Sequence, residues 1–415
     1  MNGPNRRVRR LEIIIAVSAG ALAACNSSSG DPEFADANRE AWVVVDGAMA
    51  PQIADFLEPA TGRARIVVSR DDHAILRIRE GEIDTLGTFF HDRYHRCGGF
   101  TAHGSLAEAE AALSDETNPV NRVVETASLV VAEPEVVQQL IPLVSPTAIV
   151  STINGLTSFG TRNYRSTGGV NAANWLRDRW TTLSAGRAGA SVSLFQHSGW
   201  PQPSVIMTLR GDELPNEVVV IGGHLDSINR SGGTSAPGAD DDASGVATLT
   251  EVVRLIISQN IRLRRTITFM AYAAEEAGLR GSAAIANDYR ARNVNVVGVM
   301  QLDMTNFDGS PHDIVLITDN VSTTQTDFLA SLAARYVPQF PVARDRCGYA
   351  CSDHASWTRA GYPSVLPFEA TLTTHNPNIH TARDTLSVSG NNANHAAKFA
   401  KLAIAYMVEM AQTPD

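Results

Sequence analysis

Apolar, β-branched runs alternate with helical segments in the second half of this 415-residue chain, and this alternation constrains the fold most strongly. The runs at 217–223 (EVVVIGG), 266–274 (TITFMAYAA) and 294–302 (VNVVGVMQL) are each long enough for a buried strand. Helical patterns over about 244–260 and 280–292 separate them. The sequence therefore predicts an α/β fold in which a mixed, mainly parallel sheet is sandwiched between helices.

Weaker patterns extend this expectation on both sides. We expect further strands over 313–318 and 363–368, helices over 149–159 and 169–185, and a final helix over 395–411. The earlier part of the chain has short β-like runs at 42–45, 64–68 and 127–132 and one helical run at 105–114, which predict a small α+β region. We therefore divide the chain into residues 1–25, 26–139 and 140–415, with no further domain after the last helix.

The first 25 residues have the organisation of an export signal. Arginines within residues 6–10 precede an apolar run over 13–24, which is too short to span a bilayer. The sequence LAAC that ends at Cys25 fits a lipoprotein signal with lipid on this cysteine, and equally an ordinary cleavage near Ala23 or Ala24. Because no later stretch is suited to cross a membrane, we predict an exported protein that is secreted or held on the cell envelope by lipid.

Charge and cysteine content narrow the possible partners. A net charge of −10 and a pI near 5.6 argue against nucleic acid or an anionic membrane as the main partner. Export permits disulfides, and Cys347 and Cys351 are the natural pair among the four cysteines, which leaves Cys97 over.

Polar residues follow each of the three main predicted strands. His224, the pair Glu275 and Glu276, and Asp303 come at the carboxyl ends of these strands, the edge at which open α/β sheets bind ligands. The loop APGADDDASG (236–245) opens from the same edge and carries three adjacent aspartates. Side by side, three carboxylates repel one another unless water or a cation intervenes.

Imidazole and carboxylate ligands together suit zinc. A further histidine is then expected, and His380 is the best candidate, with His375 and His354 as rivals. Two histidines and three carboxylates can hold two divalent ions if one carboxylate bridges them, and such a site activates water. Asp226 is placed to orient His224. One of the two neighbouring glutamates is expected to be a ligand and the other a general base.

The stretch HDRYHRCGGF (91–100) is a second place where a metal could bind, through His91, His95 and Cys97. A structural turn built on Gly98 and Gly99 explains it more simply.

Six motifs occur in one order along the chain: GGHLDS (222–227), PGADDDASG (237–245), AYAAEEAGLRGS (271–282), QLDMTN (301–306), CGYACSDHASW (347–357) and NPNIHTARDT (376–385). With these motifs the chain resembles the secreted bacterial leucyl aminopeptidases, a family of co-catalytic di-zinc exopeptidases. The resemblance covers about 140–415 closely. It implies the zinc-exopeptidase fold, with about eight strands, and two Zn²⁺ per chain.

The resemblance also implies a role for each site residue. His224 and Asp303 would bind one zinc, Glu276 and His380 the other, and Asp241 would bridge them. Glu275 would be the general base, Asp226 would orient His224, and Tyr349 would stabilise the oxyanion. An apolar substrate pocket would be formed by Met304, Ile317, Leu366, Phe368 and Ile379. Leu372 and His375 depart from the aromatic residues expected in leucine-specific members.

The implied activity is removal of apolar N-terminal residues, leucine above all, from peptides or unfolded proteins with a free N-terminus. Residues 26–139 resemble the family's pro-region, a folding aid and inhibitor removed by proteolysis, and we expect a monomer. Three other functions are possible on the same fold. The first is a glutaminyl cyclase, but this enzyme uses one zinc and would not need five ligands. The second is a carboxypeptidase, which would bind the C-terminal carboxylate of its substrate through Arg344, Arg346 or Arg359, and the third is a non-catalytic scaffold.

Overall fold

The computed structural model describes residues 37–61, 65–70, 72–94, 98–117, 129, 131–132, 134–230 and 233–411. The predicted export signal and Cys25 lie outside these residues, as do His95 and Cys97.

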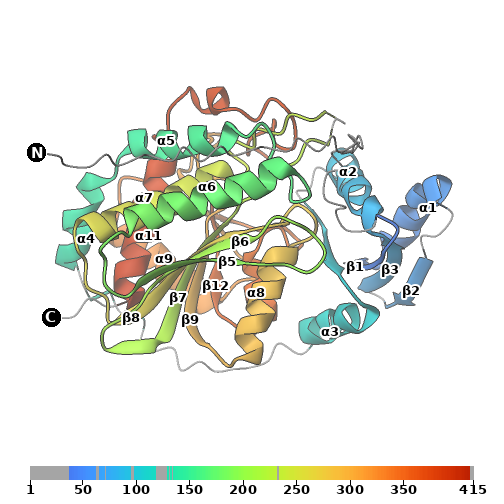
Figure 1. Ribbon diagram of the computed structural model, residues 1–415, viewed down its shortest axis with the longest axis horizontal. Helices are drawn as coiled ribbons and strands as arrows, with labels where there is room; N and C mark the ends of the chain where they lie inside the picture. Colours follow the sequence, from blue (N-terminus) through green and yellow to red (C-terminus); the bar gives the residue numbers. More distant parts are fainter. Residues whose placement is uncertain are drawn as a thin grey trace, which may run out of the picture. The chain divides into compact units, whose positions relative to one another are not determined.

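Helices and strands alternate along the described chain (Figure 1). The α-helices are α1 (Ala50–Thr61), α2 (Ile83–Tyr94), α3 (Leu106–Thr117), α4 (Pro134–Leu140), α5 (Pro146–Thr157), α6 (Thr167–Leu183), α7 (Ala243–Ser258), α8 (Arg280–Ala291), α9 (Thr323–Tyr336), α10 (His354–Arg359) and α11 (Ala396–Ala411). The strands are β1 (Glu40–Asp46), β2 (Arg65–Ser69), β3 (His73–Arg79), β4 (Phe100–His103), β5 (Ala190–Phe195), β6 (Ser204–Leu209), β7 (Leu214–His224), β8 (Arg265–Tyr272), β9 (Asn295–Gln301), β10 (Ile314–Ile317), β11 (Val342–Asp345), β12 (Ser364–Val365) and β13 (Pro367–Phe368). Short 3₁₀ turns are η1 (Glu80–Glu82), η2 (Ile141–Leu143) and η3 (Leu386–Ser389).

The main sheet has six strands in the order β12-β9-β7-β8-β6-β5. Strands β12, β9, β7 and β8 run parallel to one another, whereas β6 runs antiparallel to β8 and β5 antiparallel to β6. A smaller sheet has the order β11-β10-β13. The prediction of a mixed, mainly parallel sheet is therefore confirmed.

Strand β7 shows why this sheet needs helices on both faces. Val219 and Ile221 belong to the largest core cluster, together with residues of α5, α6, α7, α9 and α11. Val218 and Val220, which point the opposite way, belong to a second cluster with residues of α8 and α10. The continuous apolar run is thus buried on both sides, and Figure 1 shows α6 and α8 on opposite faces of the sheet.

Two expectations about strands need correction, and one pair of strands was not expected. The predicted strand over 363–368 is two short pieces, because β12 pairs with β9 in the main sheet and β13 pairs with β10 in the smaller one. The run at 127–132 is not a strand at its described positions 129, 131 and 132, and the Ala132 amide donates to the Glu409 carboxylate (2.7 Å) instead. The hairpin of β5 and β6 was not predicted, because β5 lies at an edge and carries the half-polar sequence ASVSLF.

The N-terminal region forms its own antiparallel sheet in the order β2-β3-β1-β4. One face of it shares a core cluster with α1 and α2, and this cluster extends to Tyr164, Ala274 and Ala277 of the following region. The last two residues flank Glu275 and Glu276. The N-terminal region therefore packs directly against the turn that carries the two glutamates.

A buried carboxylate adds a polar anchor to this contact. The Glu80 side chain is fully buried and pairs with Arg280, with Arg165 (2.9 Å) and with Arg39 (3.7 Å). Burial opposes ionisation of Glu80, but these arginines outweigh it and its pKa is lowered.

No single helix in the described residues is long and apolar enough to span a membrane. The bent pair formed by 135–143 and 146–157 passes the test of length and composition when taken together. Val137, Leu140, Ile149 and Ile153 of this pair are buried in the main core cluster.

Candidate active site

The parallel strands bring the polar residues of the sequence motifs to one edge of the main sheet. His224 is the last residue of β7 and lies in register with Tyr272 at the end of β8, so that Glu275 and Glu276 follow just beyond. Gly222 is in register with Gln301 at the end of β9, and Asp303 follows two residues later. Ala274, Met304 and His380 all have positive φ values (55°, 55° and 56°), a conformation that non-glycine residues adopt at functional sites.

Five side chains meet at this edge around Asp241. One oxygen of its carboxylate lies 2.9 Å from His224 Nε2, and the other lies 3.0 Å from His380 Nε2. Asp303 Oδ1 is 3.5 Å from His224 Nε2, and Glu276 Oε2 is 3.0 Å from His380 Nε2. All five are buried. They form two groups of possible ligands, with Asp241 between them.

The three adjacent aspartates of the loop have separate surroundings. Asp242 caps α7: its carboxylate accepts from the backbone amides of Gly245 (2.8 Å), His224 (2.9 Å) and Met304 (3.1 Å). Asp240 accepts from the Asn306 amide (3.0 Å) and from the Asn376 side chain (3.1 Å).

Asp241 differs from its neighbours because its carboxylate faces two imidazoles. Although Asp242 also lies within 4.8 Å of His224 and Asp303, backbone amides already engage both of its oxygens. Burial opposes ionisation of Asp241, yet His224 and His380 lower its pKa. Of the three carboxylates, Asp241 is therefore the one that is free to contact ions on both sides.

His380 is the histidine that the fold brings to these carboxylates. Its backbone carbonyl accepts from the Arg230 amide (2.9 Å), which ties its loop to the loop after β7. The rivals considered from sequence lie elsewhere. His354 begins α10 and faces the Asp319 carbonyl (3.3 Å), and burial lowers its pKa to about 4. His375 contacts the Leu372 carbonyl through Nδ1 (2.9 Å) and lines the neighbouring cavity.

Asp226 connects two parts of the site. Its Oδ1 lies 3.6 Å from His224 Nδ1, and its carboxylate accepts from the backbone amides of Glu275 (3.0 Å) and Glu276 (3.2 Å). Asp226 thus faces the imidazole, as predicted, and also fixes the turn that carries both glutamates. The contact with this turn was not predicted from the sequence.

Glu275 is one of the acids that line the cavity beside the cluster. It lines this cavity together with His224, Asp241 and Asp303. Burial raises the pKa of Glu275 well above its ordinary value. A carboxylate with a raised pKa is a better proton acceptor, which suits general-base chemistry.

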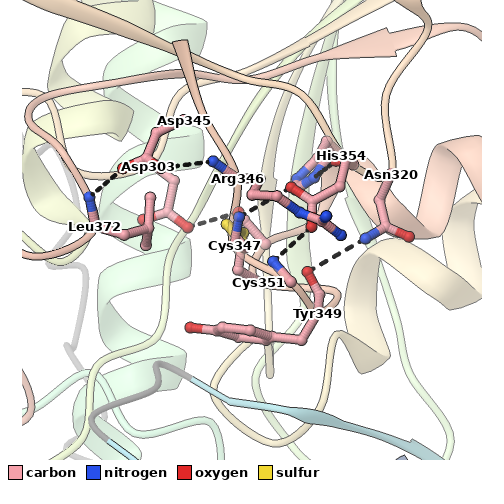
Figure 2. Close-up of a disulfide and its surroundings, with 12 residues drawn as sticks. Asp303, Asn320, Asp345, Arg346, Cys347, Tyr349, Cys351, His354 and Leu372 are labelled. Carbon is pink, nitrogen blue, oxygen red and sulfur yellow. Dashed lines mark hydrogen bonds between the residues drawn. A yellow bond between two sulfur atoms is a disulfide. The ribbon is translucent and has the colours of Figure 1, made fainter.

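The disulfide predicted between Cys347 and Cys351 is present, with 6.1 Å between the two Cα atoms. Figure 2 shows the Tyr349 side chain projecting from this small loop, while the Tyr349 backbone carbonyl accepts from Asn320 (3.2 Å). Ser352, just after the disulfide, donates to Asp303 Oδ2 (2.6 Å). The loop therefore places Tyr349 at the cavity and holds one of the acidic side chains of the cluster.

The apolar part of the cavity is one compact cluster. Met304, Ile317, Leu366, Phe368 and Ile379 are buried together, and Cys347, Cys351 and Leu372 pack against them. Met304, Leu366 and Phe368 line the cavity as predicted, whereas Ile317 and Ile379 belong to the same cluster without lining it. The cavity is lined by both apolar and polar groups, so that a ligand with one apolar end and one polar end fits it.

Several residues that hold the site in place escaped the sequence analysis. Arg162 is fully buried and donates to the carbonyls of Leu225 (2.8 Å) and Gly238 (2.9 Å), which joins the two loops. Asp384 accepts from the amides of Asp240 (3.2 Å) and Asp241 (3.0 Å). Asp384 could have been recognised as a site residue because it lies in the motif NPNIHTARDT. Arg162 lies in none of the six motifs, so the sequence gave no indication of its role.

The stretch 91–100 lies near the cluster but does not join it within the described residues. The His91 ring of α2 is 5.3 Å from the His380 ring, and His91 Nδ1 contacts Asp92 (3.2 Å). Gly98 and Gly99 have φ values of 99° and 108°, which fits the turn expected there.

Comparisons with known proteins agree with this geometry. The model of peptidase family M28 matches residues 204–407. A leucine aminopeptidase 1 of Sclerotinia sclerotiorum is 37% identical over 68% of this chain and 76% of its own length. A leucine aminopeptidase 1 of Arthroderma otae is 34% identical over 88% of this chain and 95% of its own. The crystal structure of the Legionella pneumophila LapA aminopeptidase, 28% identical, covers 91% of this chain and 99% of its own with a TM-score of 0.79.

These matches extend over most of both chains and include the strands and loops that bring the buried histidines and carboxylates together. The chain therefore belongs to peptidase family M28 and is a peptidase related to leucine aminopeptidases.

Proposed function

We propose that this protein is a zinc-dependent aminopeptidase that removes apolar N-terminal residues, preferably leucine, from peptides or unfolded proteins with a free N-terminus. One observation carries the proposal: a single buried carboxylate, Asp241, has one oxygen 2.9 Å from His224 Nε2 and the other 3.0 Å from His380 Nε2. Membership of a peptidase family and the leucine aminopeptidase relatives support the reaction class.

The residues present fit a pair of zinc ions. Asp241 Oδ2 and His380 Nε2 lie 3.0 Å apart but not in hydrogen-bond geometry, and among the described side chains these two atoms and Glu276 Oε1 are buried without a hydrogen bond. Such burial is costly unless a cation satisfies them. His224 and Asp303 would hold one ion, Glu276 and His380 the other, and Asp241 both. Nitrogen and oxygen donors in this mixture suit zinc. Bound zinc would lower the pKa of water and polarise the scissile carbonyl.

The chain's own residues supply the remaining steps. The Glu275 carboxylate takes a proton from the attacking water and delivers it to the nitrogen of the leaving amine. The Tyr349 hydroxyl donates to the carbonyl oxygen as negative charge develops there. The apolar cluster around Met304 and Phe368 receives the side chain of the first residue. Leu372 and His375 line the same cavity, so the preference among apolar side chains depends on them.

The N-terminal region is proposed to be an inhibitory pro-region, spanning about residues 26–139 and removed by proteolysis. Its helix α2 lies against one side of the site: the His91 ring lies 5.3 Å from the His380 ring, and Gly87 packs against Arg230. A peptide that reached the cluster from this side would collide with α2. Export, by a signal over residues 1–25 with or without a lipid on Cys25, is proposed from the sequence alone.

Hydrolysis of leucine p-nitroanilide, free and N-acetylated, tests the proposed function. The purified protein, after limited proteolysis, is assayed with and without a zinc chelator, and its metal content is measured. We expect chelator-sensitive cleavage of the free substrate alone and two zinc ions per chain. Cleavage of both substrates would indicate an endopeptidase or amidase. Cleavage of neither substrate would instead support a glutaminyl cyclase, a carboxypeptidase or a non-catalytic scaffold. One zinc ion per chain would then indicate the cyclase, and no zinc the scaffold.

A further inference from the structure

Arg230 is a buried cation that the proposed mechanism does not use. It lies in the loop after β7, and its side chain is only 4% exposed. Within the described part of the chain, none of its three guanidinium nitrogens has a hydrogen-bond partner. A guanidinium has five N–H donors, and burying them unpaired is unfavourable. A buried guanidinium with unpaired donors is suited to bind hydrogen-bond acceptors of a ligand.

Asp84 of α2 interacts electrostatically with this guanidinium, and the acid that forms an ion pair with it among the described residues is Glu276, whose Oε2 is 3.5 Å from Arg230 Nη2. This distance is too long for a hydrogen bond. Glu276 is also one of the proposed zinc ligands, so a bound ion would already balance its charge. Orientation of Glu276 therefore does not explain why a whole guanidinium is buried beside it.

Helix α2 is what covers Arg230. Gly87 lies over the guanidinium, and a Cβ atom placed at this glycine would be 3.2 Å from Nη2 and 3.4 Å from Cζ. Glycine inside a helix is unfavourable by comparison with alanine, and here it allows the helix backbone to approach the cation closely. If α2 is removed with the pro-region, the guanidinium becomes open to solvent beside the cluster.

The position of Arg230 relative to the cavity suggests which part of a substrate it meets. The cavity for the first side chain is lined by His224, Glu275 and Asp303 together with the apolar cluster, whereas Arg230 and Glu276 do not line it. A peptide whose first side chain fills this cavity, with its carbonyl at the cluster, must continue away from the cavity. The space that α2 now occupies, next to His380 and Arg230, is available for that continuation.

The geometry points to Arg230 as a carboxylate-binding residue that becomes available when α2 is removed, and that selects substrates with a negative charge on the residue after the cleaved bond. This inference rests on the proposed aminopeptidase function and specifies its substrates. The carboxylate is either the C-terminal group of a dipeptide or an acidic side chain at the second position. A planar guanidinium binds either one through two parallel hydrogen bonds.

The test compares kcat/KM for pairs of substrates that differ only in this charge. Leu-Gly is compared with Leu-Gly-amide, and Leu-Asp-amide with Leu-Asn-amide, using the full-length protein after limited proteolysis. For at least one pair we expect a preference of about tenfold for the charged member, the size of a charge-assisted hydrogen bond. The preference should fall to about one in Arg230→Gln and be partly restored in Arg230→Lys. If Arg230→Gln loses the preference within the first pair, Arg230 binds the C-terminal carboxylate of a dipeptide. If it loses the preference within the second pair, Arg230 binds an acidic side chain at the second position.

Arg262→Gln is the matched control, because it removes an exposed arginine that pairs with Asp212 at the surface, and it should keep the wild-type preference. Since each ratio is taken within one variant, a general loss of activity cancels. Equal ratios in the wild type and Arg230→Gln, or an equal loss on every substrate, would overturn the assignment while cleavage of leucine anilide still supported the aminopeptidase. If the wild type cleaves none of these substrates, it is the proposed function that fails.

A binding measurement gives a second readout that does not depend on turnover. In the Glu275→Gln background, calorimetry with Leu-Gly and Leu-Gly-amide, and with Leu-Asp-amide and Leu-Asn-amide, should show the same preference for the charged member. Adding Arg230→Gln should abolish it. An unchanged difference in affinity would contradict a role for Arg230 in binding the carboxylate.

Discussion

At the scale of single residues, the environment of each carboxylate decides its role. Asp242 is engaged by three backbone amides, whereas Asp241 is placed between two imidazoles. The two adjacent residues therefore have different chemistry, although the sequence presents them as equivalent. The same holds for Glu275, which lines the cavity, and Glu276, which faces His380.

Replacing Glu275 tests the assignment of the general base. Glu275→Gln keeps the shape of the side chain and removes its ability to accept a proton, so kcat for leucine anilide should fall by about a hundredfold to ten-thousandfold. Zinc content and melting temperature should stay near those of the wild type. Glu213→Gln, at a surface pair with Arg264, is the matched control. Turnover close to the wild-type value in Glu275→Gln would rule out this mechanism.

Asp226 provides a second prediction at this scale, because it holds the glutamate turn without contacting substrate. In Asp226→Asn the side chain keeps one acceptor oxygen for two backbone amides, and it no longer faces His224 with a negative charge. Zinc affinity or kcat should fall by about 10- to 100-fold. Titration with a competing chelator measures the affinity, and Asp212→Asn at the surface is the control. If affinity and kcat were both unchanged, Asp226 would have no positioning role.

At the scale of elements, the sequence predicted those helices and strands whose pattern is continuous in the chain, and missed features that depend on partners far away in the sequence. The three parallel strands and α7 were predicted because their apolar runs and the aspartate cap are continuous in the chain. The segment 363–368 was misjudged because its two halves pair with strands far apart in sequence. Arg162 and Arg230 could not be recognised, since their partners come from separate loops and from α2.

The ion-pair cluster at Glu80 makes the docking of the N-terminal region dependent on pH. Its pKa is lowered by Arg280, Arg165 and Arg39 against the opposing effect of burial. A carboxylate with a lowered pKa stabilises the folded state fully above its ordinary value of 4.5, and this contribution is lost as the pH falls through the lowered value. Docking of η1, α2 and β3 should therefore weaken in acid.

Glu80→Gln tests this prediction. It leaves the buried arginines without their counter-charge and should destabilise the docked region by about 3 kcal/mol at neutral pH. Hydrogen exchange of the amides in β3 and α2 measures the loss. The wild type should approach the variant in acid, whereas the variant should show little dependence on pH from this site. Glu40→Gln, at an exposed pair with Arg77, is the control. Equal protection in all three proteins at neutral pH would contradict the prediction.

At the scale of the whole molecule, the site and the core depend on the same elements. The sheet that buries Val219 and Ile221 on one face and Val220 on the other also ends at the cluster of proposed metal ligands. Three strand ends and two loops meet there, and buried carboxylates without a cation repel one another. Bound zinc is therefore expected to stabilise the fold as well as to take part in the reaction.

Removing zinc should consequently lower the melting temperature of the protein. A ligand present at 100 times its Kd stabilises the folded state by about 2.7 kcal/mol. With an unfolding entropy of about 2.1 cal/mol/K per residue, chelation should lower the melting temperature by about 3–5 °C in a protein of this size. Differential scanning calorimetry with chelator, and then with zinc added back, measures the shift. Asp241→Asn isolates the cause, because it weakens both proposed sites at once while reducing the repulsion between carboxylates. The variant should melt at nearly the same temperature with and without chelator. A shift in the variant as large as that in the wild type would show that the stabilising ion binds away from Asp241.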